Sequence, residues 1–286
     1  MPNSSWKIKI LVNNWVGEGG CVAEHGLSMA VEGGELPDGQ FVLFDTGRSP
    51  EVLANNAKAM SVDWNGLRQI VLSHSHYDHS GSLMGIHELV KRPVSVLTHP
   101  DTFTPKASCK PSFRDIGIPF TREQLEKKGF SLSGVSADTP LTPTFLVTGT
   151  IDRVFGFEAL SHKDLLKGQA GNYVPDTVAD DRALVIREPG GGFHLICGCC
   201  HSGLLNTLTH AAAASGERQI LTIVGGLHFG AYDGQTLDRV CDHLAEWKPR
   251  RIVPLHCTGL KGAAHLWKRL GDVVEFHGAG EEIALS

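Results

Sequence analysis

The residues with the most evident chemistry form one short loop, residues 73–81, with the sequence SHSHYDHSG. It contains three imidazoles and a carboxylate, at His74, His76, Asp78 and His79. Imidazole nitrogen and carboxylate oxygen are the ligands that Zn²⁺, Mn²⁺ and Fe favour at hydrolytic centres. On an extended or turning loop, alternate residues such as His74 and His76 point the same way. The intervening turn directs Asp78 and His79 to a neighbouring point, so the loop can serve two metal positions.

Strand and helix patterns alternate along the chain and must position this loop. We expect strands at residues 7–12, 27–31, 41–44, 70–72, 94–97, 145–147, 183–187, 193–197, 220–224, 251–254 and 273–276. We expect helices at about residues 49–60, 83–90, 121–128, 203–214, 235–246 and 263–270. This order of elements predicts a layered α/β fold.

Residues 100–145 differ from the rest because they are rich in proline and show one convincing helix. Such a segment is typical of an insertion over a site rather than of a core. We therefore expect a single domain over residues 1–286, with a lid at about residues 100–180.

The histidine loop and three further motifs resemble the metallo-β-lactamase superfamily over nearly the whole chain. Residues 44–47 read FDTG and are similar to the family's Asp-Thr-Gly turn, in which Asp45 would support the metal-binding loop. His201 in CCHSG and His256 in PLHCTG match two later histidines of the family. The resemblance implies a four-layer αββα sandwich.

The resemblance also implies two divalent metal ions, most simply zinc, with manganese or iron as alternatives. It places His74, His76 and His201 around one ion. It places Asp78, His79 and His256 around the second, with a water or hydroxide between the two ions.

A closer subgroup, the dihydropterin/aminobenzene-ribofuranosyl-phosphate synthase-like branch, resembles this sequence better. The likeness is carried by five segments, at residues 24–28, 74–81, 198–203, 225–228 and 256–259. Better-known hydrolases of the superfamily have an Asp that bridges both metals, and the matching position here looks like Cys199. The bridge is then missing, supplied by Cys199 or replaced from elsewhere.

Five other residues are candidates for the site. His228 follows a strand and two glycines, and we expect it to contact the substrate or to act as a general acid. Glu24 and His25 either line the pocket or occupy a surface turn. Asp180 and Asp181 are candidates near the metal, although paired exposed acids at a strand start are the more ordinary interpretation.

The overall composition excludes several classes of function. The chain has 286 residues with 26 Lys and Arg against 31 Asp and Glu, a net charge of −5, and no basic block that would track nucleic acid. Its apolar stretches are shorter than the roughly 20 residues of a membrane span. Isolated basic residues could neutralise an anionic small-molecule substrate, and these are Lys106, Lys110, Arg114 and Arg153.

Seven cysteines, an odd number with three of them clustered, do not resemble a disulfide framework. They favour a reducing cytoplasm. Cys197 and Cys200 form a CxxC pair, but the pair lies at the end of an expected buried strand instead of opening a helix. We interpret these two cysteines as small apolar residues beside a metal ligand.

These observations predict a hydrolase in which a metal-activated hydroxide attacks an ester, lactone or phosphodiester-type bond, with Asp78 orienting the nucleophile. Three alternatives stay open: a metal-dependent transferase like the branch's namesake, a mononuclear iron redox enzyme, and a binding module with a vestigial site. A requirement for a second organic substrate would identify the transferase, and oxygen consumption would identify the redox enzyme.

Overall fold

The computed structural model describes residues 5–158, 164–169 and 171–285. The chain divides into two compact units, which we call unit 1 and unit 2. Unit 1 comprises residues 1–136, 161–180 and 278–284, and unit 2 comprises residues 137–160, 181–277 and 285–286. Both units combine strands with helices, so the expected mixed α/β class is confirmed.

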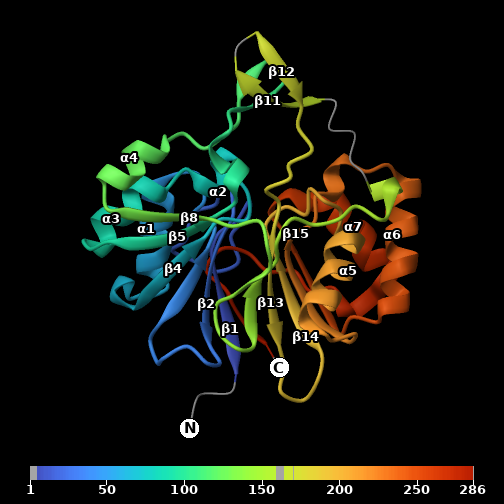
Figure 1. Cartoon of the computed structure of the whole chain (residues 1–286). Coiled ribbons are helices and arrows are strands. Elements are labelled where there is room, and N and C mark those ends of the chain that lie inside the picture. Colours follow the sequence, from blue (N-terminus) through green and yellow to red (C-terminus); the bar gives the residue numbers. More distant parts are fainter. Residues whose placement is uncertain (1–4, 159–163, 170, 286) are drawn as a thin grey trace. The chain divides into compact units, whose positions relative to one another are not determined.

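Unit 1 is built on a seven-stranded sheet with the strand order β17-β1-β2-β3-β4-β5-β8 (Figure 1). Its strands are β1 (Trp6–Val12), β2 (Ser28–Gly33), β3 (Phe41–Phe44), β4 (Leu67–Val71), β5 (Val94–Thr98), β8 (Phe130–Gly134) and β17 (Glu282–Leu285). β1, β2 and β3 pair antiparallel, whereas β3, β4, β5 and β8 run parallel. Because β3 and β4 are parallel, the loops that follow them emerge at the same edge of the sheet.

Three helices of unit 1 pack on one face of this sheet (Figure 1). They are α1 (Pro50–Ala59), α3 (Leu83–Val90) and α4 (Arg122–Lys127). Each contributes a wholly buried apolar side chain to the core, namely Leu53, Ile86 and Leu125. The three helices lie where the sequence predicts them.

A smaller four-stranded sheet also belongs to unit 1, with the order β12-β11-β6-β7. Its strands are β6 (Lys106–Ser108), β7 (Arg114–Asp115), β11 (Leu165–Gln169) and β12 (Asn172–Pro175). In Figure 1, β11 and β12 project away from the helices of the same unit. This sheet corresponds to part of the expected lid, of which residues 159–163 and 170 lie outside the described residues.

The expectation that all of residues 100–145 stand outside the core is wrong for α4 and β8. β8 pairs in parallel with β5 at the edge of the seven-stranded sheet. Leu125 of α4 and Phe130 of β8 are 0% and 3% exposed within the core. The helix was expected at residues 121–128, but the proline-rich connection before it concealed β8 and the packing of both elements in the core.

Unit 2 contains a six-stranded sheet with the order β16-β15-β14-β13-β10-β9. Its strands are β9 (Thr139–Pro140), β10 (Phe145–Val147), β13 (Ala183–Arg187), β14 (Phe193–Cys197), β15 (Ile220–Gly226) and β16 (Arg251–Leu255). β14, β15 and β16 are parallel neighbours, so their carboxyl ends lie at one edge of the sheet. The loops after these three strands carry His201, His228 and His256.

Helices α5 (Leu204–Ser215), α6 (Gly234–Trp247) and α7 (Gly259–Leu270) pack against the sheet of unit 2 (Figure 1). Leu208, Val240 and Leu266, one from each helix, are fully buried in the core of this unit. These helices agree with the sequence-based expectation.

The strand expected at residues 273–276 does not form. Gly271 has a φ of 72° and opens a 3-10 turn, Gly271–Val273, in place of an extended segment. Val274 then makes one isolated parallel bridge to Ile252, and Glu275 donates its N–H to the Ile252 carbonyl at 2.9 Å. The glycine turn leaves too few residues beside β16 for a strand, although their apolar pattern suits one.

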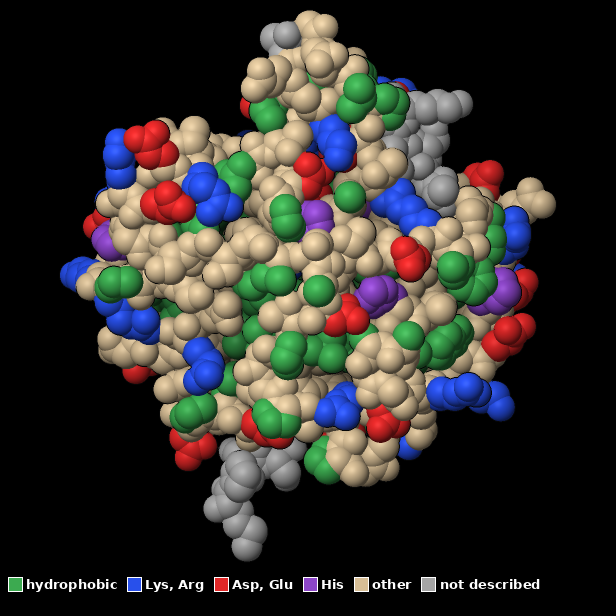
Figure 2. Space-filling model, in the orientation of Figure 1, with side chains coloured by type: hydrophobic (Ala, Val, Ile, Leu, Met, Phe, Trp, Pro, Cys, Tyr) green, Lys and Arg blue, Asp and Glu red, His purple; other side chains and the backbone are tan. Residues whose placement is uncertain are grey.

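Two surface features follow from the composition. Basic and acidic side chains are interspersed over the face of the molecule shown in Figure 2. Among the described residues, none of the helices has the length and apolar character needed to cross a membrane.

Candidate metal-ligand clusters

The histidine loop predicted from the sequence is a buried segment of unit 1. It follows β4 and ends in the single-turn helix α2 (Tyr77–Ser80). Its four candidate ligands are each 7% exposed or less, namely His74, His76, Asp78 and His79. Nε2 of His74 lies 3.0 Å from Nδ1 of His76, and the rings of His74 and His79 have centroids 4.2 Å apart. Unit 1 therefore brings its four predicted ligands together.

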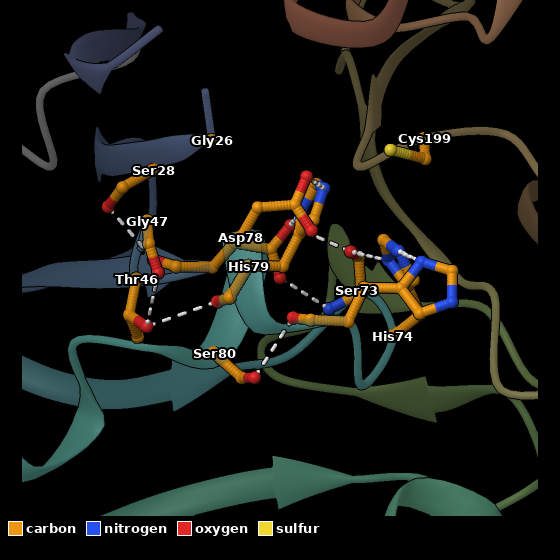
Figure 3. Close-up of polar contacts among 12 residues, drawn as sticks. Gly26, Ser28, Thr46, Gly47, Ser73, His74, Asp78, His79, Ser80 and Cys199 are labelled. Atoms are coloured by element: carbon orange, nitrogen blue, oxygen red, sulfur yellow. Dashed lines mark hydrogen bonds and ion pairs between the residues drawn. The ribbon is translucent and has the colours of Figure 1, made fainter. Parts of the chain in front are cut away.

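Asp45, in the expected Asp-Thr-Gly turn after β3, forms hydrogen bonds with two residues of this loop, Ser73 and His79, which are labelled in Figure 3. Its Oδ1 accepts the N–H of Ser73 at 2.7 Å, and its Oδ2 accepts the Ser73 hydroxyl at 2.7 Å. The same Oδ2 lies 2.6 Å from Nδ1 of His79. Because an ionised carboxylate only accepts hydrogen bonds, His79 donates from Nδ1 and its Nε2 carries the lone pair that a metal needs.

Ser73 fixes the tautomer of His74 in the same way. The Ser73 hydroxyl has one proton, which it donates to Asp45, so its oxygen accepts from Nδ1 of His74 at 2.9 Å. Nε2 of His74 then carries a lone pair. Burial lowers the pKa of His76 to about 3 and lowers the pKa of His74 well below its usual value. Both rings are therefore neutral at pH 7, which is the form that binds metal ions.

A buried ion pair supports the middle of the loop. Oδ2 of Asp180 accepts the N–H of Ser75, between the first two histidines, at 2.9 Å. Oδ1 of Asp180 lies 2.5 Å from Nζ of Lys106, which also lies 3.3 Å from a carboxylate oxygen of Asp176. Burial opposes the charge on Lys106, but the two carboxylates outweigh it and raise the pKa of the ammonium.

These contacts correct the interpretation of Asp180 and Asp181 as exposed acids, since the two residues are 0% and 1% exposed. Lys106, at 1% exposed, is likewise not a solvated surface residue. No local pattern indicates the Lys106–Asp180 pair, because the partners are 74 positions apart in the sequence. Their pairing depends on β6 of the small sheet.

Glu24 and His25 take different roles. Oε1 of Glu24 accepts the N–H groups of Arg48 and Ser49, both at 3.0 Å, and so supports the start of α1. Nε2 of His25 lies 3.1 Å from Oδ2 of Asp78, and its side chain is 51% exposed. His25 is therefore the accessible partner of a candidate ligand, and Glu24 supports the backbone after the Asp-Thr-Gly turn.

Unit 2 contains a second cluster, of sulfur and nitrogen donors. Two sets of three residues each bring their donor atoms within 4.8 Å of one another. The first set is Cys199, His201 and His228, and the second is Cys199, His256 and Cys257. The predicted residues His201, His228 and His256 are thus joined by Cys199, which was predicted only as a replacement for a bridging Asp. Cys257 was missed, although it follows a predicted ligand directly in the sequence.

The backbone around this cluster is strained at each strand end. Cys200, His228 and His256 have φ values of 54°, 54° and 46°. Non-glycine residues with positive φ are uncommon and concentrate at functional sites. Gly225 and Gly226 are needed for packing against β14 and Cys257, because an added Cβ would lie 2.0 Å from the Cys197 carbonyl oxygen and 2.7 Å from Sγ of Cys257, respectively.

Buried carboxylates accept hydrogen bonds from backbone N–H groups at and just before the start of α5, the helix after the cysteine-containing loop. Oδ2 of Asp181 accepts the N–H of Ser202 at 2.8 Å. Oε2 of Glu158 accepts the N–H groups of Leu205 at 2.8 Å and Asn206 at 3.2 Å. Burial raises the pKa of Glu158 to about 7 and that of Asp181 to about 6. Glu158 was not predicted from the sequence, where it is an isolated acid in a loop.

The seven cysteines, all within the described residues, are thiols rather than disulfides. Cys197 and Cys200 belong to the apolar core of unit 2. A hydrogen bond with Cys197, together with burial, raises the pKa of Cys200 well above its usual value. The Cys200 thiol is therefore protonated, and both cysteines are packed in the core, as the interpretation of apolar residues beside a ligand expects.

Comparisons with known proteins show which family and which proteins this chain is similar to. The family model described as the metallo-beta-lactamase superfamily matches residues 23–146. The chain is 27% identical over 243 residues to 7,8-dihydropterin-6-methyl-4-(beta-D-ribofuranosyl)-aminobenzene-5'-phosphate synthase of Methanocaldococcus jannaschii, covering 84% of this chain and 82% of that protein. It is 29% identical over 273 residues to an uncharacterized protein of the same archaeon, covering 94% and 97% of the two chains.

Solved structures show the same fold. The crystal structure of Tm1679, described as a metal-dependent hydrolase of the beta-lactamase superfamily, has a TM-score of 0.79 at 24% identity and covers 97% of this chain and 98% of its own. Unliganded yeast PDE1 has a TM-score of 0.55 at 11% identity, covering 100% and 99% of the two chains. The arrangement of strands and helices is therefore that of the metallo-β-lactamase fold.

Proposed function

Because the chain has the metallo-β-lactamase fold and the family model of that superfamily matches residues 23–146, we propose that it is a metal-dependent hydrolase of a small molecule. The bond it cleaves is of the ester, lactone or phosphodiester type. The observation that carries this proposal is the chain of hydrogen bonds from Asp45 through Ser73 to His74 and from Asp45 to His79. Such a chain holds imidazoles in the tautomer that binds metal ions.

The proposed ligands are the six expected from the sequence. They are His74, His76, Asp78, His79, His201 and His256. Nitrogen and carboxylate donors of this kind suit zinc, and also manganese and iron. Two such ions would lower the pKa of a water molecule towards neutrality and would stabilise negative charge on the reacting oxygen.

The protein's own groups then have three tasks. Asp45 and Ser73 keep the histidine nitrogens oriented throughout the reaction. The carboxylate of Asp78 orients the attacking water. Nε2 of His25 lies 3.1 Å from Oδ2 of Asp78, so His25 is placed to exchange a proton with this carboxylate. His228, beside the ring of His201 with centroids 4.4 Å apart, is the proposed proton donor to the leaving group.

A metal-dependent transferase is the second candidate, and one observation favours it. The relative that is 27% identical over most of both chains is named as a synthase. A synthase of this kind would use the same ligands to activate a leaving group on one substrate for attack by a second organic substrate. Product formation that requires the second substrate would select this candidate over hydrolysis.

The first experiment is elemental analysis of protein purified without chelator, followed by a screen of phosphodiesters, lactones and esters. We expect two zinc or manganese ions per chain and turnover that chelation removes. His76→Ala should lose both metal and activity. The control is His265→Ala, which removes an imidazole of α7 that pairs with Asp238 of α6, and this variant should keep both. One iron per chain would favour the redox alternative, and a fully active, metal-free His76→Ala variant would overturn the proposal.

The remaining expectations about the cell stand on composition. The thiol state of the seven cysteines suits a reducing cytoplasm. The partner we propose is a small molecule. The net charge of −5 disfavours polyanionic partners such as nucleic acid or an acidic membrane surface.

A further inference from the structure

We infer that the metal bound by His256 is also bound by sulfur, from Cys199 and Cys257, so that unit 2 holds a thiolate-containing site for a thiophilic cation such as Zn²⁺. The inference rests on the proposed metal-binding role of His256. It adds two ligands that the histidine and carboxylate set does not contain. It also assigns a function to Cys257, which sequence analysis left without one.

The spacing of the donor atoms carries the inference. Sγ of Cys199, a ring nitrogen of His256 and Sγ of Cys257 all lie within 4.8 Å of one another. A tetrahedral zinc site has Zn–S bonds of about 2.3 Å and Zn–N bonds of about 2.0 Å, which puts its donors about 3.3–3.8 Å apart. Side-chain movements on the order of 1 Å therefore suffice to close this set around one ion.

The fold brings the three donors to one place from two strands of the same unit. Cys199 follows β14, and the other two donors, His256 and Cys257, follow β16, with both strands ending at one edge of the sheet. The thiol of Cys257 lies 3.6 Å from the carbonyl oxygen of Cys199. Gly226 at the end of β15, the strand between them, leaves the space that Sγ of Cys257 occupies, since a Cβ there would lie 2.7 Å from this sulfur.

Cys199 is the residue that the two donor sets of unit 2 have in common. It lies within 4.8 Å of donor atoms of His201 and His228 as well as of His256 and Cys257. A thiolate can contact two ions at once. Its sulfur is therefore placed where a single side chain could bridge the ion bound by His201 and the ion bound by His256. Loss of Cys199 should then be more damaging than loss of Cys257.

Sulfur ligation has a consequence for metal selection. Thiolate is a soft ligand that favours Zn²⁺ and other thiophilic ions, whereas Mn²⁺ prefers oxygen. A site with one or two thiolates should bind Zn²⁺ in strong preference to Mn²⁺. Replacing a cysteine by serine keeps the shape of the side chain but exchanges the soft donor for a hard one, so it should reduce the preference for zinc.

The test uses the full chain loaded with Co²⁺ and, separately, competition titrations with Zn²⁺ and Mn²⁺. We expect the cobalt protein to show thiolate-to-metal charge-transfer absorption in the near ultraviolet. Cys199→Ser should reduce this absorption strongly, Cys257→Ser should reduce it less, and the double variant should abolish it. Each variant should weaken Zn²⁺ affinity by about 100-fold or more, since changes next to metal ligands already cost about 10–100-fold, with a smaller effect on Mn²⁺.

Cys109→Ser is the matched control, because this exposed thiol lies outside both clusters. Its absorption and affinities should equal those of the unmodified protein. Cobalt binding without charge-transfer absorption, or Cys199→Ser and Cys257→Ser variants with unchanged zinc preference, would overturn the inference while leaving the proposed hydrolase intact. Conversely, sulfur-ligated cobalt in a protein that hydrolyses none of the screened substrates would support this site and count against the proposed function.

Discussion

Oδ2 of Asp45 lies 2.6 Å from Nδ1 of His79, and the same carboxylate accepts two hydrogen bonds from Ser73. One buried carboxylate thus fixes the tautomer of a candidate ligand and the backbone that enters the histidine loop. It also acts indirectly on His74, through the hydroxyl of Ser73. The geometry makes Asp45 a positioning residue whose effect should appear in metal binding.

Asp45→Asn should weaken metal binding because an amide nitrogen cannot accept the proton of His79. We expect a loss of about 10–100-fold in zinc affinity, the range found when an outer partner of a metal-binding histidine is removed. Competition titration against a chromophoric chelator measures this. Asp63→Asn makes the same chemical change at the start of a 3-10 turn, where Asp63 accepts the N–H of Asn65, and should leave the affinity unchanged.

Removing one partner of the buried Lys106–Asp180 ion pair should destabilise the protein, because the other charge stays buried without its counterion. Lys106→Met leaves the carboxylates of Asp176 and Asp180 buried without their cation, and removing one partner of a buried pair typically costs about 3–5 kcal/mol. Urea unfolding of the metal-free protein measures the change in free energy of unfolding. Lys110→Met removes an exposed ion pair with Asp164 and should change stability by less than about 1 kcal/mol. Equal effects of the two substitutions would contradict the assignment.

The residues that the sequence revealed share one property, which is that their chemistry is concentrated in a few adjacent positions. His74, His76, Asp78 and His79 lie in one loop, and the loop's position after a short apolar strand identifies it. Asp45 could be assigned because the Asp-Thr-Gly turn is itself a local motif. Most of the strands and helices that support these residues follow from hydrophobic periodicity. At residues 273–276 a glycine turn overrides an apolar pattern, and β8, β17 and the strands of the small sheet were not expected.

The residues that the sequence did not reveal depend on contacts between distant segments. Lys106 and Asp180 are in contact because β6, which carries Lys106, and the residues that follow β12, which include Asp180, belong to the same unit. Glu158 meets the N–H groups of α5 across 47 positions of sequence. Each is an ordinary charged residue in its local context. Burial converts these residues into structural supports, and burial of a single polar residue has no local signature.

Glu158 should make stability depend on pH. Its pKa is raised from 4.5 to about 7 by burial, so the folded protein binds a proton that the unfolded chain releases between these values. The contribution is therefore fully present below pH 4.5 and is lost as the pH rises through about 7. Glu158→Gln removes this dependence. The difference in free energy of unfolding between the two proteins should shift in favour of the variant by a few kcal/mol, on the order of 1.4 per pKa unit, from pH 4.5 to 8.

Urea unfolding at several pH values measures that difference and cancels the contributions of other buried groups. Glu217→Gln is a suitable control, because the Glu217 side chain also accepts a backbone N–H, that of Gly192, and the substitution makes the same chemical change. Its pH dependence should parallel that of the unmodified protein. A Glu158→Gln variant whose stability also runs parallel to the unmodified protein from pH 4.5 to 8 would show that Glu158 is ionised throughout.

Substitution of His228 should show whether this residue donates a proton or binds a metal ion. As the proposed proton donor, its loss in His228→Ala should leave the metal content intact and lower kcat by about 100-fold or more for substrates with poor leaving groups. A substrate that releases a nitrophenolate needs no proton on departure, so its kcat should change far less. The ratio of the two rates, compared with elemental analysis of the same preparations, decides the role. Loss of a metal ion from His228→Ala would instead make His228 a ligand beside Cys199 and His201, whose donor atoms lie within 4.8 Å of its own.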